Sequence, residues 1–299
     1  MNDDATTPFR CRSRTLDFSL GAKVMGILNT TPDSFHDGGT LASSSGGLDL
    51  ERALERARRM LREGADILDI GGESTRPGAE TVGTPEEIRR TAPLIRLLRR
   101  ETDAVISIDT YKAEVAEAAL EAGADLVNDI SGFSFDGAMA GVCRRYGAAA
   151  VLMHTAVRPA EMQWSTGTTE GEGDIVRSVR EFLAEAVRRA EDAGVPDTIV
   201  DPGFGFGKSV RENFELLRRL GELRAAGRPI LAGLSRKSFL GKVSVPEGEA
   251  ALPTGERLPA TISAETLALV QGADIIRAHD VREARACVMV VRAMREGAG

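Results

Sequence analysis

One short pattern recurs along the chain: a glycine, a small residue, and then a continuous run of apolar residues. It is clearest at Gly64, Gly123, Gly147 and Gly272. A glycine just past a helix can adopt the left-handed conformation that ends it, and short, continuously apolar runs are typical of strands buried on both faces. The pattern therefore predicts repeated passages from helix into buried strand.

The apolar runs alternate with stretches whose apolar residues are spaced by three and four, as in amphipathic helices. These helical stretches include 50–63, 85–100, 112–122, 174–193, 211–220 and 261–271. The predicted strands lie near residues 23–29, 65–71, 105–109, 125–129, 148–153, 198–201, 229–234 and 273–278. Two polar stretches, 155–173 and 242–260, are expected to be long loops.

This succession of strand-then-helix units predicts the α/β class and a single (β/α)₈ TIM barrel over residues 14–297. Residues 14–20 are expected to add a short lead-in strand or hairpin, and residues 1–13 to be a disordered tail. A doubly wound open sheet is the alternative. It normally has fewer strands and a Gly-rich phosphate turn after the first one, which the residues from Asn29 onward do not form.

Composition and charge exclude several classes of protein. Lys and Arg number 38 against 45 Asp and Glu, which gives a formal net charge of −7, whereas general nucleic-acid binding needs a basic face. No apolar run is long enough to span a bilayer, and the acidic N-terminus lacks the apolar core of a signal peptide. Cys11, Cys143 and Cys287 form no CxxC pair and indicate reduced thiols. We therefore expect a cytoplasmic protein without nucleic-acid or membrane partners.

Polar or charged residues stand at the carboxyl end of every predicted strand, where TIM barrels carry their catalytic groups. They are Asn29, Glu73 to Arg76, Asp109, Asn128 with Asp129, His154, Asp201, Ser235 to Lys237, and Arg277 with His279. Any one of them could be only a helix cap. Because all the strand ends share the feature, we predict a polar site at this end of the barrel.

The residue types in this set indicate two kinds of ligand group. The residues that suit a phosphate or pyrophosphate are Arg76, Arg236, Lys237 and Arg277, with Ser74, Thr75 and His279. Asp109, Asn128 and Asp201 suit the amino–imino edge of a planar heterocycle. Phe35 and Phe206 stand on Gly- and Pro-rich loops, where contact with a ligand is expected; the alternative for Phe206 is a staple within its own loop.

Two other barrel chemistries fit less well. A metal-dependent hydrolase would need clustered histidines, and the histidines of this chain, His36, His154 and His279, are far apart in sequence. A Schiff-base aldolase would need a lysine within a strand, whereas Lys237 follows the seventh strand. The neighbouring Arg236 could lower the pKa of Lys237, so this alternative is weakened and stays open.

Eight strings of the sequence resemble the signatures of dihydropteroate synthases. They are NTTPDSFHDGG from residue 29, DIGGESTRPG from 69, SIDT from 107, VNDISG from 127, LMH from 152, DPGFGFGK from 201, SRKSFLG from 235 and RAHDV from 277. They occur in the family's order, and with the first predicted strand the resemblance spans residues 23–281. The chain is thus similar, over nearly its whole length, to a family of TIM barrels.

The resemblance implies a transferase of folate biosynthesis. It would join 6-hydroxymethyl-7,8-dihydropterin pyrophosphate to p-aminobenzoate, giving 7,8-dihydropteroate and pyrophosphate. The substitution would be dissociative, so that no protein nucleophile is needed, and its catalytic residues would be Asn29, Asp109, Lys237 and Arg277. The resemblance also implies Mg²⁺ bound by Asn29 together with the pyrophosphate, a homodimer, and inhibition by sulfonamides, which imitate p-aminobenzoate.

The resemblance further implies the residues of each subsite. The pterin would be held by Asp109, Asn128, Ile130, Met153, Asp201, Gly233 and Lys237. The pyrophosphate would be bound by Asn29, Ser74, Thr75, Arg277 and His279. The p-aminobenzoate would be surrounded by Phe35, Thr75, Arg76, Pro77, Phe206, Arg236, Lys237 and Ser238, some of them on loops that close over it and exclude water.

Three residues depart from the family's pattern. Thr30 and His36 stand where the family more often has Val and Ser, and Thr155 replaces the usual Met after His154. We expect these changes to tune the loops without abolishing activity. The functional alternatives are a pterin-binding methyltransferase, which would not need the TPDSF, STRP and SRKS strings, and an inactive homologue, which should have lost a catalytic residue.

Overall fold

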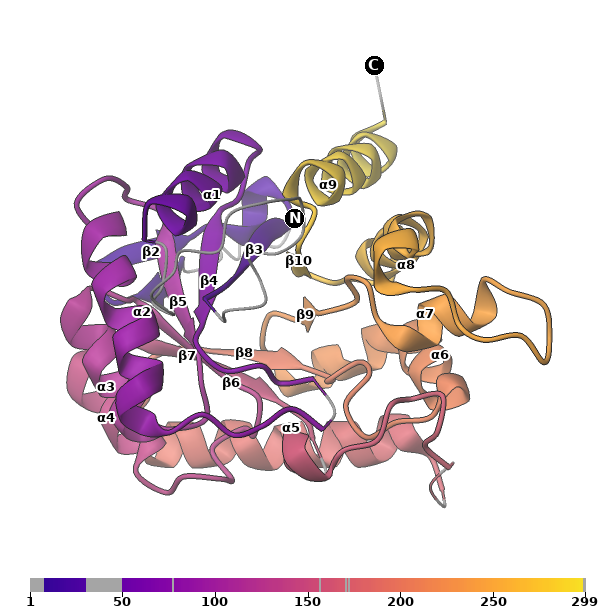
Figure 1. The fold of residues 1–299 in the computed structure, drawn as a ribbon, viewed down its shortest axis with the longest axis horizontal. Helices are drawn as coiled ribbons and strands as arrows, with labels where there is room; N and C mark the ends of the chain where they lie inside the picture. Colours follow the sequence, from indigo (N-terminus) through magenta and orange to yellow (C-terminus); the bar gives the residue numbers. More distant parts are fainter. Residues whose placement is uncertain are drawn as a thin grey trace, which may run out of the picture.

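The computed structural model describes residues 8–30, 50–76, 78–155, 157–169, 171 and 173–297. Its parallel strands form the barrel of Figure 1, in the order β8-β7-β6-β5-β4-β3-β10-β9. They are β3 (Lys23–Asn29), β4 (Ile67–Gly71), β5 (Val105–Asp109), β6 (Leu126–Asp129), β7 (Ala149–Met153), β8 (Thr198–Asp201), β9 (Leu231–Ala232) and β10 (Ile275–Ala278). A bridge between Val200 and Ile230 brings the two ends of this order together. The predicted TIM barrel is confirmed, and the open sheet is excluded.

Helices follow the strands and surround the barrel (Figure 1). They are α1 (Leu50–Arg62), α2 (Thr84–Leu98), α3 (Ala113–Ala122), α4 (Met139–Tyr146), α5 (Ile175–Asp192), α6 (Val210–Arg218), α7 (Ser238–Val243), α8 (Leu258–Val270) and α9 (Val281–Glu296). Gly123 and Gly147 end α3 and α4 in the left-handed conformation, with φ of 117° and 63°. This is the helix stop that the recurring glycine pattern predicted.

Several predicted segments differ in extent from the structure. The strand expected at 229–234 is shortened to β9, because Pro229 has no N–H to donate and the chain turns at Ser235 and Arg236. The loop expected at 155–173 contains the short 3₁₀ helix η3 (Pro159–Glu161). Within 242–260, α7 ends and α8 begins, with η5 (Thr254–Glu256) between them.

The amino-terminal end of the barrel is closed by a hairpin. Strand β1 (Phe9–Cys11) pairs antiparallel with β2 (Arg14–Leu16). The hairpin side chains Phe9, Cys11 and Leu16 are buried in one cluster with residues from the amino-terminal ends of the barrel strands, such as Ile67 and Val105. The expected hairpin is confirmed, but the disordered tail expected over 1–13 is wrong for Phe9–Cys11, because alternate side chains of this segment fill the barrel's end. Residues 1–7 lie outside the described residues.

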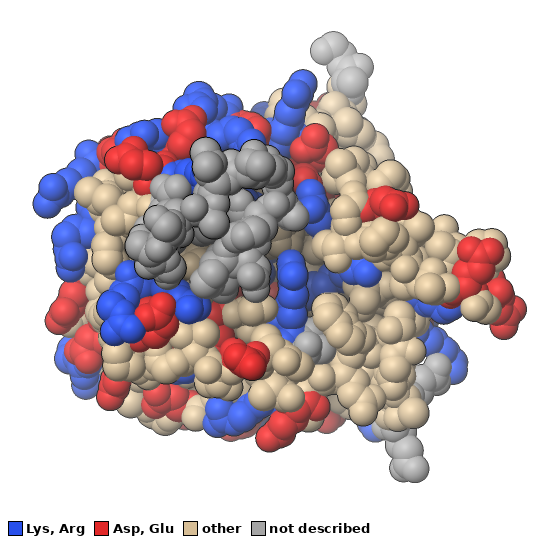
Figure 2. Space-filling view, in the orientation of Figure 1, with Lys and Arg blue, Asp and Glu red and all other residues tan. Residues whose placement is uncertain are grey.

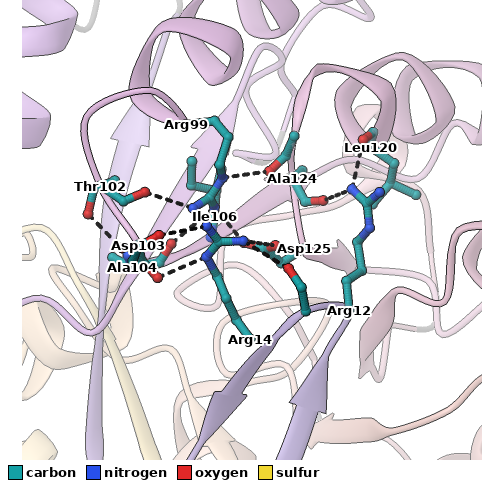
Figure 3. Close-up of polar contacts among 12 residues, drawn as sticks. Arg12, Arg14, Arg99, Thr102, Asp103, Ala104, Ile106, Leu120, Ala124 and Asp125 are labelled. Atoms are coloured by element: carbon teal, nitrogen blue, oxygen red, sulfur yellow. Dashed lines mark hydrogen bonds and ion pairs between the residues drawn. The ribbon is translucent and has the colours of Figure 1, made fainter.

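Arginines fasten this hairpin to the barrel (Figure 3). Asp125 is 2% exposed, and its carboxylate accepts hydrogen bonds from Arg14 at 3.3 Å, Arg99 at 2.5 Å and the main-chain N–H of Ile106 at 3.0 Å. Arg12 donates to the carbonyl oxygens that precede β6, including Ala124 at 2.7 Å. The amino-terminal end is therefore packed and cross-linked, and the opposite end remains for the site.

No helix within the described ranges is long and apolar enough to cross a membrane.

Candidate active site

Four charged or polar side chains from different strands meet at the carboxyl end of the barrel. Arg277 of β10 donates from Nε to Oδ2 of Asp69 at 2.6 Å and from Nη2 to Oδ2 of Asp109 at 2.5 Å. Asn128 of β6 donates from Nδ2 to the same Asp69 oxygen at 3.0 Å. Because parallel strands end at one edge of the barrel, Asp69 and Arg277, which are 208 positions apart in sequence, belong to one network.

This network leaves buried acceptors without partners. Within the described part of the chain, Oδ1 of Asp69, Oδ1 of Asp109 and Oγ of Ser107 accept or donate no hydrogen bond. Buried polar atoms are normally paired, so atoms like these indicate a place for a ligand's donors. Burial raises the pKa of Asp109 and of Asp201, while Arg277 opposes the shift of Asp109. The arrangement can accept hydrogen bonds from N–H groups and stabilise a nearby positive charge.

Asp69 is a site residue that the strand-end reasoning missed. It lies two residues before the end of β4 and is completely buried. In the sequence it therefore looks like part of an apolar strand. A charged residue within such a run is a signal that could have identified it, since an ionised carboxylate is rarely buried without a partner.

The loop after β8 brings its backbone close to β7. The Asp201 carboxylate accepts the Gly203 N–H at 2.7 Å. Gly203 has φ of 69°, and a Cβ atom there would lie 2.0 Å from the carbonyl oxygen of His154. Only glycine fits this position, which explains part of the Gly-rich string that follows Asp201.

Lys237 and Phe206 are in direct contact in the site. The Lys237 ammonium lies 4.2 Å from the centroid of the Phe206 ring. A Cβ atom on Gly205 would come within 2.9 Å of the Lys237 side chain, so the loop after β8 also touches this lysine. Burial, and next the charge of Arg277, lower the pKa of Lys237 to about 8. Lys237 is therefore mostly charged at neutral pH.

An apolar wall lies beside these charges, separate from the main core. Its buried members come from β7 and from the loops that follow β6, β7 and β8. They are Ile130, Met153, Met162 and Phe206, with Tyr111 and Val157 packed against them. The contact of Phe206 with Lys237 and with this wall shows that the ring does more than staple its own loop. Met162 and Tyr111 were not predicted, because neither stands directly at a strand end.

Neutral His279 is held by a serine. Its Nδ1 lies 3.0 Å from Ser235 Oγ, which also accepts the His279 main-chain N–H at 3.2 Å. Burial, followed by the charges of Arg277 and Arg236, lowers the pKa of His279 to about 3. Arg236 donates two hydrogen bonds to Asp280, at 2.9 and 2.7 Å. The structure thus brings Arg236 to the mouth within an ion pair.

Asn29 lies at the end of β3, close to the charged network. A Cβ atom on Gly71 would be 3.6 Å from Asn29 Oδ1 and 3.6 Å from Asp109 Oδ2. The neighbouring Thr30 is buried and donates from Oγ1 to the Gly71 carbonyl at 3.0 Å. The hydroxyl group that Thr30 has in place of the family's usual Val methyl group is therefore paired by a hydrogen bond to the neighbouring strand β4.

Asn29 could hold a magnesium ion, but only with other ligands. Mg²⁺ commonly keeps several waters and uses one or two protein oxygens together with substrate phosphates. The chain that the structure describes has no group of three His, Cys, Asp or Glu residues suited to a metal. One carboxamide oxygen beside the acidic Asp109 fits the sparse kind of site, with most ligands supplied by substrate and water.

The loop after β4 is anchored by a buried carboxylate. Glu73 accepts hydrogen bonds from the Tyr111 hydroxyl at 2.5 Å, from Lys112 at 2.6 Å and from the Val82 N–H at 2.7 Å. A cavity of about 320 Å³ borders Glu73, Tyr111 and Lys112. Ser74 and Thr75 are half-buried, and Arg76 is exposed on this loop.

The remaining predicted positions either surround the mouth of the barrel or lie outside the described residues. Gly233 faces the Asp201 carboxylate, which a Cβ atom would approach to 3.9 Å, and Ser238 is buried at the start of α7. Thr155 donates to the Val157 carbonyl at 2.8 Å. Phe35, His36 and Pro77 lie outside the described residues. Figure 2 shows Lys and Arg atoms in the middle of the face that carries these strand ends.

Comparison with known proteins identifies the family. The pattern of the family described as pterin binding enzymes matches residues 25–279. The chain is 45% identical over 284 residues to the dihydropteroate synthase of Synechocystis sp., which covers 94% of this chain and 93% of that protein. The chain belongs to the dihydropteroate synthase family. The resemblance carried by the eight strings is thereby confirmed.

Solved structures of dihydropteroate synthases agree with this. The Yersinia pestis dihydropteroate synthase, solved with a sulfonamide drug complex, has a TM-score of 0.85 and 37% identity, and the match covers 97% of this chain and 100% of that one. The Xanthomonas albilineans dihydropteroate synthase, solved in complex with 7,8-dihydropteroate, has a TM-score of 0.81 and 36% identity, with 97% and 99% covered.

Proposed function

We infer that this protein is a dihydropteroate synthase. It joins 6-hydroxymethyl-7,8-dihydropterin pyrophosphate to p-aminobenzoate, and it releases 7,8-dihydropteroate and pyrophosphate in folate biosynthesis. Beyond family membership, the observation that carries this function is the network of Arg277 with Asp69, Asp109 and Asn128. Its unpartnered carboxylate oxygens suit a heterocycle rich in N–H groups, and its guanidinium suits the leaving pyrophosphate.

The pterin occupies the slot between the charged network and the apolar wall. Asp109 and Asp201 accept its N–H groups, and Asn128 presents its carbonyl oxygen because its amide nitrogen donates to Asp69. Ile130, Met153 and Gly233 contact the flat ring. The support for this assignment is the burial of both carboxylates beside an apolar surface.

The reaction begins with cleavage of the bond between the pterin methylene carbon and the pyrophosphate oxygen. The oxygen leaves with the electron pair, and Arg277, His279, Ser74 and Thr75 stabilise the charge that develops on it. The carbon becomes cationic, and Asp109 stabilises that charge from its buried position. The amine of p-aminobenzoate then forms the new C–N bond, and its proton passes to the released pyrophosphate, so the protein supplies no nucleophile.

Mg²⁺ is the proposed cofactor, held by Asn29 together with the substrate's pyrophosphate. When bound, it supplies additional positive charge that stabilises the departing phosphate oxygens. The position of Asn29 Oδ1 near Gly71 and Asp109 supports this assignment.

The p-aminobenzoate binds beside the contact that Phe206 makes with Lys237. The ring contacts Phe206, and the Lys237 ammonium, with Ser238, Thr75 and Arg236, provides polar contacts. By the family resemblance, Phe35, Arg76 and Pro77 also contact it. Sulfonamides bind in the same place, a proposal supported by the sulfonamide complex of the Yersinia pestis relative.

We also propose a homodimer in the cytoplasm. Helices α8 and α9 pack side by side and expose apolar residues, a feature that marks interaction surfaces when the residues are contiguous. These residues are Leu267, Val270, Met289, Val290 and Met294. Free, buried Cys11, Cys143 and Cys287 support a reducing compartment.

A direct assay tests the activity. Purified protein is mixed with both substrates and Mg²⁺, and dihydropteroate and pyrophosphate are measured together. Equal amounts of the two products are expected. Release of pyrophosphate without dihydropteroate, or no product at all, contradicts the proposed function.

A further inference from the structure

Lys208 is a buried cation that the proposed reaction does not use. It follows β8 and is only 1% exposed. Its ammonium donates to three main-chain carbonyl oxygens: Gly203 at 2.8 Å, Phe206 at 3.1 Å and His154 at 3.3 Å. An ammonium has three N–H groups, so each one has an acceptor here. Burial lowers the pKa of Lys208 to about 7, and these three acceptors, together with the charge of Asp201, favour the ammonium form.

The loop from β8 to α6 is wrapped around this ammonium. Gly203, Gly205 and Gly207 have φ of 69°, 80° and 59°, and these left-handed turns direct the carbonyl groups inward. Two of the three acceptors belong to this loop, and the third belongs to the end of β7. Lys208 therefore joins the loop to the neighbouring strand.

Asn213 of α6 holds the other side of the same loop. Its Oδ1 accepts the Gly205 N–H at 2.7 Å, and its Nδ2 donates to the Ser209 carbonyl at 2.7 Å. These bonds do not involve Phe206. The backbone of Phe206 is held by two bonds of its own: its N–H donates to the Gly203 carbonyl, and its carbonyl accepts from Lys208.

The pterin side of the site is held differently. Met153 of β7 lies opposite Asp201 of β8 in the ladder, and the His154 N–H donates to the Asp201 carbonyl at 3.0 Å. Sheet hydrogen bonds therefore fix these two residues even without the Lys208 charge. Phe206, beyond the ladder, has no such support from the sheet.

We propose that Lys208 is a positioning residue, whose ammonium holds the Phe206 backbone so that the Phe206 ring stands opposite Lys237 and completes the p-aminobenzoate subsite. The proposal rests on the proposed function of that subsite. A neutral side chain in place of Lys208 leaves three buried carbonyls without a donor. The loop then shifts to reach water, and it moves Phe206 more than the strand-held Asp201.

The test is the substitution Lys208→Met, which removes the charge and keeps the length of the apolar stem. The KM for p-aminobenzoate and the Kd for sulfamethoxazole are expected to rise about tenfold, which corresponds to about 1.4 kcal/mol. The KM for the pterin pyrophosphate is expected to change less than about threefold, about 0.7 kcal/mol on the same scale. Unchanged KM values, or an equal rise of both, would overturn the proposal.

The control is Arg14→Met at the opposite end of the barrel. Arg14 is also a cation that donates to a main-chain carbonyl, that of Asp103 at 2.9 Å. This variant is expected to lower the Tm without changing either KM. A change of the p-aminobenzoate KM in Arg14→Met of the size seen in Lys208→Met would show that general destabilisation is sufficient, and would contradict the proposal.

A measurement on the wild-type protein covers the case in which Lys208→Met does not fold. The chain has five lysines, so its ¹⁵N-labelled lysine ammonium signals form a simple spectrum. The Lys208 signal, assigned by Lys→Arg substitution at the other four positions, is expected to exchange slowly and to shift when sulfamethoxazole binds. A Lys208 signal that exchanges fast or does not shift would overturn the proposal. Absence of product from the wild-type protein in the activity assay, by contrast, contradicts the proposed function itself.

Discussion

The ammonium of Lys237 lies 4.2 Å from the centre of the Phe206 ring. A charged lysine over an aromatic face is attracted by the ring's electrons, and the attraction grows as water is removed. The same ammonium feels the charges of Asp201 and Asp109. One cation therefore stands between the aromatic side of the site and its carboxylates, where the two substrates have to meet.

Replacing Lys237 is expected to weaken the binding of both substrates. In Lys237→Ala, the KM for p-aminobenzoate and for the pterin pyrophosphate should each rise about tenfold or more, since a charged hydrogen bond contributes about 1.5–3 kcal/mol. Lys242→Ala, which removes a half-buried lysine bonded to the Glu249 carbonyl, is the control and should leave both constants unchanged. Normal binding of both substrates by Lys237→Ala would show that its assignment is wrong.

Asn29→Ala is expected to act mainly through magnesium. The Mg²⁺ concentration that gives half-maximal activity should rise about tenfold, because one of the few protein oxygens available to the ion is lost. The KM for p-aminobenzoate should stay unchanged. The adjacent Thr30→Val, whose hydroxyl donates to the Gly71 carbonyl, is the matched control. If the Mg²⁺ dependence of Asn29→Ala equals that of the control, Asn29 is not a ligand.

Ser235→Ala tests how His279 meets the pyrophosphate. Ser235 Oγ accepts the His279 main-chain N–H, so its single hydroxyl hydrogen is available for Nδ1. Neutral His279 then carries its proton on Nε2 and can donate it to a phosphate oxygen. The KM for the pterin pyrophosphate should rise about two- to tenfold in the variant, as for loss of one hydrogen bond.

Nitrogen NMR of the His279 ring checks the same argument directly. Wild type should show the Nε2–H tautomer, and Ser235→Ala should show a mixture of both. A wild-type ring protonated on Nδ1 would rule out this role for Ser235.

The barrel was predictable because its signals are local. Strands β3, β5 and β8 begin and end where their apolar runs do. The hairpin strand Phe9–Cys11 was not recognised, since three residues carry too little periodicity and their burial depends on the far ends of other strands. Long-range packing of this kind leaves no mark within the segment itself.

The site shows the same division. Asp109 and Asp201 were predicted because strand ends meet at one edge of any TIM barrel. Asp69 and Lys208 were missed, because neither stands at a strand end: Asp69 lies within β4, and Lys208 lies in the loop that follows β8. Their signal is a charge inside an apolar or glycine-rich stretch, which acquires meaning only when the partner atoms are known.

Asp125→Ala is expected to destabilise the fold without altering the chemistry. It removes the buried carboxylate that binds Arg14 and Arg99 (Figure 3), so that Arg99 loses this ion pair, whereas Arg14 keeps its ion pair with Asp103. Loss of one partner of a buried ion pair costs about 3–5 kcal/mol. Urea unfolding should show this decrease, while the KM values of the folded variant stay at wild-type level. A shift of either KM would mean that the hairpin end communicates with the mouth.

His154 is expected to make the fold sensitive to acid. Its ring packs edge-on against Phe182, with centroids 4.9 Å apart, and burial followed by the charge of Lys208 lowers its pKa to about 3. An unfolded histidine titrates near 6.5. Between these values the unfolded chain binds one proton more than the native protein, so the contribution is present above pH 6.5 and is lost as the pH falls toward 3.

The magnitude follows from the same shift and can be isolated with one substitution. Each pH unit below 6.5 lowers the free energy of unfolding by about 1.4 kcal/mol through His154, or about 2 kcal/mol at pH 5. In His154→Phe the aromatic contact is kept and the titration is removed, while His279, whose pKa is lowered in the same direction, is present in both proteins. Urea unfolding at pH 7 and pH 5 should show that wild type loses about 2 kcal/mol more than the variant. Equal losses in the two proteins would mean that His154 becomes protonated within the fold at pH 5.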